Sequence, residues 1–139
     1  MTTTMIIAVS VFTYFSTLGL ILSLVWTFKI DTAYKMLNMA AGYNLHEAAA
    51  ADELSGKAMK FLLIDFTSQM IGVNLFALHV IWFAFRHGQM WAWCIMWYYP
   101  VMFAWHYLHY AKGTGFSKVQ IVYFVLSAGT LILAYSNFN

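Results

Sequence analysis

Four long apolar stretches alternate with short polar connections along this chain. A helix needs about 20 residues to cross the roughly 30 Å hydrocarbon core of a bilayer, and each stretch approaches or exceeds that length. The stretches cover residues 5–28, 59–85, 90–110 and 119–135. The pattern therefore predicts an all-α fold, an integral membrane four-helix bundle that forms a single transmembrane domain over residues 1–139.

The segment 29–58 breaks this pattern, because it is polar and yet too long to be a bare connection in a compact protein. Within it Ile30, Tyr34 and Leu37 recur at helical spacing, with charged residues on the other side. This arrangement is typical of a short amphipathic helix lying on the membrane surface. We expect Gly42 to end that helix.

Three local signals predict where helices begin, turn and bend. Asn44, with Glu47 three residues later, predicts a capping box that starts a second short helix. Residues 86–89 are all that separates the second and third apolar stretches, so these two helices are expected to be antiparallel neighbours. Pro100 lacks a backbone donor and clashes with the preceding turn, which predicts a kink in the third helix.

The composition supports the membrane interpretation. Hydrophobic residues make up 63% of the 139 residues and charged residues 9%, whereas soluble domains carry about 25% charged residues. So few charges cannot cover a water-facing surface, so the outer face must be apolar. The net charge of +2 is small and its charges are scattered, which argues against a nucleic-acid partner. The single cysteine, Cys94, excludes a disulfide within the chain.

The basic residues predict the orientation in the membrane. Cationic residues near the ends of membrane helices stay on the cytoplasmic side. Arg86 flanks one side of the predicted bundle. Six lysines flank the other side: Lys29, Lys35, Lys57, Lys60, Lys112 and Lys118. We therefore expect both termini outside and the segment 29–58 on the cytoplasmic side.

Ionisable groups within hydrocarbon are costly and are therefore candidate site residues. Counted from the tight turn, Asp65, Gln69, His106 and His109 fall at similar depths. If their two helices face each other, Asp65 pairs with His106. Such a cluster would bind the polar head of a hydrophobic ligand, move a proton, or only fix helix packing. Asn74 lies on the opposite face of its helix, so Asp65→Asn is expected to reduce stability or ligand occupancy more than Asn74→Ala.

Two metal-centred alternatives use the same region. Met102, His106 and His109 lie close to one helical face and would suit a soft metal such as copper(I). His79 lies about 11 residues from the depth of His106, or roughly 16 Å. That separation disfavours a haem held by both histidines of one chain, while a haem held by one histidine or shared with another subunit stays open.

The run FRHGQMWAWCIMWYYPVMFAWHYL, from Phe85 to Leu108, carries an arginine and glycine, a Trp-Ala-Trp start and a mid-helix proline. In these features it resembles the junction of the second and third helices in small DoxX-like four-helix membrane proteins. The resemblance covers about a third of the chain. It implies the four-helix topology and carries no particular activity.

Three functions are consistent with these features. The leading hypothesis is a non-catalytic accessory subunit of a larger membrane protein complex, with other membrane subunits or further copies of the chain as partners. The first alternative is a binding module or enzyme for a hydrophobic ligand such as a quinone, sterol or lipid, held by Asp65, Gln69, His106 and His109. The second alternative is a metal or proton conduit through Met102, His106 and His109.

Overall fold

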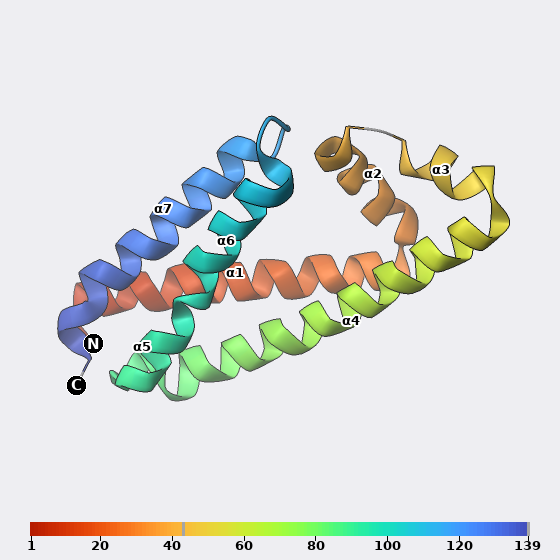
Figure 1. Cartoon of the computed structure of the whole chain (residues 1–139). Coiled ribbons are helices and arrows are strands. Elements are labelled where there is room, and N and C mark those ends of the chain that lie inside the picture. The colour runs from red at the N-terminus through yellow and green to blue at the C-terminus, as the bar shows by residue number, and fades with distance from the viewer. Residues whose placement is uncertain (43, 139) are drawn as a thin grey trace.

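The computed structural model describes residues 1–42 and 44–138, without the side chains of residues 40, 41 and 110. Within these residues the fold is all-helical and contains no strand (Figure 1). The elements in chain order are α1 (Thr3–Phe28), α2 (Ile30–Ala41), α3 (Leu45–Ala51), α4 (Glu53–Phe83), the 3-10 turn η1 (Phe85–His87), α5 (Met90–Met96), α6 (Tyr98–His106), the π-helical turn η2 (Tyr107–Ala111), α7 (Ser117–Ala134) and the 3-10 turn η3 (Tyr135–Asn137).

Among the described residues, three helical segments are long and apolar enough to cross a membrane: α1, α4 continued by η1, and α7 continued by η3. The third helix expected over residues 90–110, with a kink at Pro100, divides at Trp97 into α5 and α6. Pro100 explains the break, since it cannot donate to the carbonyl one turn earlier and its ring crowds that turn. The Trp97 amide instead donates to Cys94, three residues back, at 3.3 Å.

The helices pack as two pairs, α1 with α4 and α6 with α7, and α7 joins the second pair to α1. The helix α4 packs along α1, whereas α6 packs chiefly on α7, which also contacts α1. After the turn at Gly88, α4 and α6 therefore diverge (Figure 1). The expectation that the two helices are neighbours is confirmed for α4 and α5, next to the turn, and is wrong for α6. The contact of α5 with α4 keeps them together near the turn, and the break at Trp97 then directs α6 toward α7.

An aromatic cluster fills the half of the bundle nearest the chain termini. The Phe15 ring lies 5.1 Å from Phe103, 5.0 Å from Tyr123 and 5.7 Å from Tyr99, measured between centroids. The Tyr99 hydroxyl also hydrogen-bonds Ser16 on α1. Aromatic contacts of this kind add to the stabilisation that burial already gives. This half of the molecule is therefore tightly packed.

Two helix boundaries predicted in the polar segment after α1 are confirmed. Gly42 ends α2 in the left-handed conformation with φ 75°, and the Asn44 side chain caps α3 by accepting from the His46 amide at 3.1 Å. Asp52 caps α4 by accepting from the Ser55 hydroxyl and amide. Those hydrogen bonds hold the pKa of Asp52 below its usual value. The two short helices lie at the end of the bundle opposite the termini (Figure 1).

Candidate functional site

A cavity of about 300 Å³ lies between α1, α4, α6 and α7, with α2 closing part of one side. Its volume is at the lower end of the range of about 300–1,000 Å³ that is typical of ligand pockets. The wall is mainly apolar and aromatic and includes Leu18, Leu22, Met70, Met102, Phe103 and Phe116. The cavity is the space that α4 and α6 leave where they diverge.

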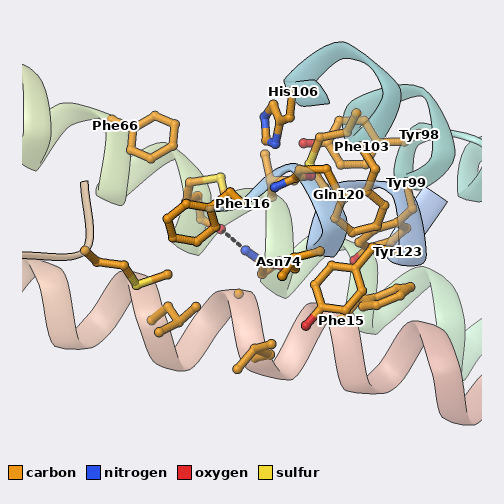
Figure 2. Close-up of a pocket in the computed structure, with 18 of the residues that line it drawn as sticks. Phe15, Phe66, Asn74, Tyr98, Tyr99, Phe103, His106, Phe116, Gln120 and Tyr123 are labelled. Carbon is orange, nitrogen blue, oxygen red and sulfur yellow. Dashed lines mark hydrogen bonds between the residues drawn. The ribbon is translucent and has the colours of Figure 1, made fainter. Parts of the chain in front are cut away.

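The cavity is open on the side between α4 and α6. Phe66 and Val73 on α4 line it and are also exposed on the outside of the molecule, as is Tyr98 on α6. Figure 2 shows Phe66 on the α4 side and Tyr98 on the opposite, α6 side. These residues form the rim of a lateral opening. A molecule can therefore reach the cavity from beside the bundle.

Asn74 on α4 is a deeply buried polar residue of the cavity, with 4% of its surface exposed. Its amide nitrogen donates to the Met70 carbonyl at 2.7 Å (Figure 2). A Cβ at Gly19 would lie 2.6 Å from the Asn74 Oδ1, closer than such contacts allow. The absence of a side chain at Gly19 thus lets Asn74 pack directly against α1.

His106 and Gln120 bring further polar groups to the wall from α6 and α7. Figure 2 shows both side chains on the same side of the cavity, beside Phe116. The Gln120 Oε1 is buried and has no hydrogen-bond partner among the described residues. The same holds for the indole nitrogen of Trp26, which lines the cavity from the last turns of α1. A buried polar atom left unpaired costs about 1–3 kcal/mol.

The structure does not bring Asp65 and Gln69 to this cavity. Both side chains are exposed on the outer face of α4, where the Gln69 amide donates to the Asp65 carboxylate at 2.8 Å. The face of α4 that packs on α1 instead carries Leu63, Thr67 and Asn74. Thr67 meets Thr27 of α1 in a hydrogen bond of 2.9 Å. The expected pairing of Asp65 with His106 is therefore corrected: the polar stripe of α4 points away from α6.

The proposed metal ligands are also divided. Met102 and His106 line the cavity, whereas His109 is exposed and its ring lies 3.9 Å from that of Trp105. The π-helical turn after His106 explains the separation, because each residue of a wider turn advances less around the helix axis. Among the described residues, no group of three or more His, Cys, Asp or Glu side chains is placed to hold a metal ion.

His79 does not approach the cavity either. Its side chain is exposed on the outer face of α4, its Nδ1 lies 2.7 Å from the Leu75 carbonyl, and its ring stacks on Phe83. Of the two histidines considered for haem binding, His106 lines the cavity and His79 does not.

Sequence reasoning missed Asn74, Gln120 and Trp26. The spacing of Gly19 and Ser23 on α1 indicated a surface for close helix contact. That signal was available for Asn74, because a polar residue opposite a glycine can be buried. Gln120 gave no such signal, since it stands one turn from the helix start beside Lys118, where exposed polar residues are common.

Comparison of the chain with known protein families, with curated proteins and with solved structures finds no match. The resemblance of residues 85–108 to DoxX-like proteins accordingly stays a prediction. The geometry of the cavity is what carries the functional proposal.

Proposed function

We propose that this chain is a multi-pass membrane protein that binds a hydrophobic molecule in the cavity between its helices. Four crossings are proposed: α1, α4, the broken unit of α5 and α6, and α7. The outer surfaces of these helices expose many large apolar side chains, among them Ile21, Phe76, Val101 and Leu133. Exposed apolar area on this scale is favourable in lipid and unfavourable in water.

The lysines support an orientation with both termini outside and α2 and α3 on the cytoplasmic side. Lys29 follows α1, and Lys112 and Lys118 flank the loop before α7. At the other end, Asn137 donates to Thr4, so the two termini of the chain lie together, and Arg86 stacks on Trp82. The cavity then lies in the cytoplasmic half of the bundle.

The observation that carries the proposal is the cavity itself, an apolar chamber with a few polar groups and a lateral opening. Pockets of this composition are the usual sites for small hydrophobic ligands. Packed interiors rarely leave such a volume empty, since each lost contact costs dispersion energy. A quinone, sterol or lipid chain entering between α4 and α6 would fill it. Bound lipid or quinone is the cofactor class this implies.

Filling the cavity tests the proposal. Leu22→Trp places a large ring where Leu22 lines the cavity, and Leu24→Trp makes the same change at an exposed position of α1 outside it. The full chain, gently extracted from membranes, is analysed by mass spectrometry for lipid bound per protein. We expect Leu22→Trp to lower the amount of bound ligand at least about fivefold, because the indole ring occupies the space that the ligand would fill. Equal occupancy in the two variants would refute the proposal.

A second function, that of an accessory subunit in a membrane complex, is favoured by the exposed pair Asp65 and Gln69. A carboxylate and an amide on a lipid-facing helix surface are costly and commonly face other protein. Changing both residues to leucine would release a neighbouring subunit or a second copy of the chain. The measurement is the mass of the gently extracted particle, and an unchanged mass would exclude this role for the pair.

A further inference from the structure

We propose that the ligand is a neutral lipid whose head carries a hydroxyl group, and that it enters from the bilayer between α4 and α6. This inference rests on the proposed function and names the ligand class of the same cavity. It follows from three observations: the charge of the lining, the kinds of unpaired polar atom at the wall, and the position of the opening.

The lining lacks the charges that an ionic head requires. None of the described residues around the cavity is a lysine, arginine, aspartate or glutamate, and His106 supplies the one basic side chain. A buried phosphate or carboxylate needs an opposite charge or several strong donors to offset its lost hydration. The six lysines lie outside this lining. A neutral head is therefore favoured over an anionic one.

The unpaired atoms at the wall are of both kinds. The Trp26 indole nitrogen is a donor and cannot accept, whereas the Gln120 Oε1 accepts. Trp26 lies near the end of α1 and Gln120 near the start of α7, so both belong to the lysine-bearing end of the bundle. A hydroxyl has one hydrogen to donate and two lone pairs to accept with. A quinone or ester head offers acceptors alone and would leave the Gln120 oxygen unpaired.

Both atoms are buried behind the cavity surface, so each side chain must rotate toward the cavity to bond the ligand. The Gln120 side chain is flexible, and a small rotation brings its Oε1 to the cavity surface at small cost. His106 lies on the same side of the cavity as Gln120 (Figure 2). The head group accordingly belongs between α6 and α7, beside His106 and Gln120.

The rim residues indicate where the apolar chain of the lipid lies. Phe66 and Val73 on α4 and Tyr98 on α6 line the cavity and are exposed on its outer side. A cavity of about 300 Å³ is at the small end for a ligand pocket, so it holds a head and part of one chain. The remainder of the chain then passes between α4 and α6 into the surrounding lipid.

Three photoreactive probes with the same chain test the head group: 1-hexadecanol, hexadecyl phosphate and hexadecane, each with a diazirine at mid-chain. The full chain in phosphatidylcholine nanodiscs is irradiated, and labelled residues are identified by mass spectrometry. We expect the alcohol to label the rim of α4 and α6 at least about tenfold more than the phosphate, because two hydrogen bonds and the absence of a buried charge favour it. Hexadecane should label about fivefold less than the alcohol.

Variants connect that preference to the proposed contacts. Gln120→Leu removes the amide oxygen and keeps a side chain of similar size. It should lower alcohol labelling about fivefold and leave hexadecane labelling within about twofold. Gln89→Leu makes the same change outside the cavity, in the turn before α5, and should alter neither. Trp26→Phe keeps an aromatic ring and removes the donor, and it should reduce the same alcohol preference if Gln120→Leu does not fold.

The outcomes separate the two proposals. Stronger labelling by the phosphate, or equal labelling by all three probes at the rim, overturns the head-group inference and leaves the cavity as a binding site. An alcohol preference unchanged in both Gln120→Leu and Trp26→Phe overturns it as well. Absent rim labelling for every probe, together with bound lipid that Leu22→Trp does not lower, removes the proposed function and the inference with it.

Discussion

Two sets of polar residues on these helices differ in what surrounds them. Asn74, His106 and Gln120 line the cavity, whereas Asp65 and Gln69 are exposed on the outer face of α4. The outer pair is joined within its own helix by one hydrogen bond between residues four apart. The inner residues come from three helices and converge on one space. The candidate site is therefore distinguished by polar side chains that converge from three helices, and not by polarity alone.

The outer polar groups of α4 find hydrogen-bond partners on the same helix. Gln69 bonds Asp65, and His79 bonds the Leu75 carbonyl, each one turn back on α4. Such local bonds need no second helix, because residues four apart are neighbours on the helix surface. An inner group such as Gln120 Oε1 has no such local partner among the described residues. Its unmet hydrogen bond is what a ligand can satisfy.

The largest expected effect comes from the contact between α1 and Asn74. Gly19→Val would drive a side chain into the Asn74 amide, and overpacking of this kind costs about 1–3 kcal/mol. Gly72→Val is the matched control, because a Cβ at Gly72 meets nothing within 4 Å. Thermal unfolding in detergent should show a clear loss for the first variant and little change for the second. A similar loss in both would mean that the outer face of α4 is packed against protein.

The next effect reverses the expectation drawn from the sequence. Asn74→Ala removes a buried amide that packs on α1 and should destabilise by about 1–2 kcal/mol. Asp65→Asn keeps the size of an exposed side chain and should stay within about 0.5 kcal/mol. Chemical unfolding of both variants measures the difference. A larger loss for Asp65→Asn would restore the polar cluster that the sequence predicted and would contradict the packing of α4.

The smallest effect distinguishes the two histidines of α6 and η2. His106→Phe removes one hydrogen-bonding group from the cavity and should weaken binding of the alcohol probe about threefold to tenfold. His109→Phe changes an exposed ring stacked on Trp105 and should leave binding within about twofold. Saturation labelling in nanodiscs gives both values. Loss of binding in the His109 variant alone would place the head group outside the cavity.

The sequence determined the helical content and the positions at which several helices begin and end. Hydrophobic length predicted α1, α4 and α7, and local hydrogen-bonding chemistry predicted the ends marked by Gly42 and Asn44. Pro100 predicted that the third segment is irregular, although the helix breaks at Trp97 rather than bending. These features depend on residues within about one turn of each other, so the sequence pattern contains them.

Tertiary packing alone decided which polar residues face inward. In a chain this apolar, both faces of α4 carry hydrophobic residues, so the pattern did not identify the packed face. Close approach to α1 selects the side with Thr67 and Asn74, because Gly19 and Thr27 leave room and a hydrogen-bond partner there. That choice turns Asp65 outward. It also separates α4 from α6, and this separation creates the cavity that no local signal predicted.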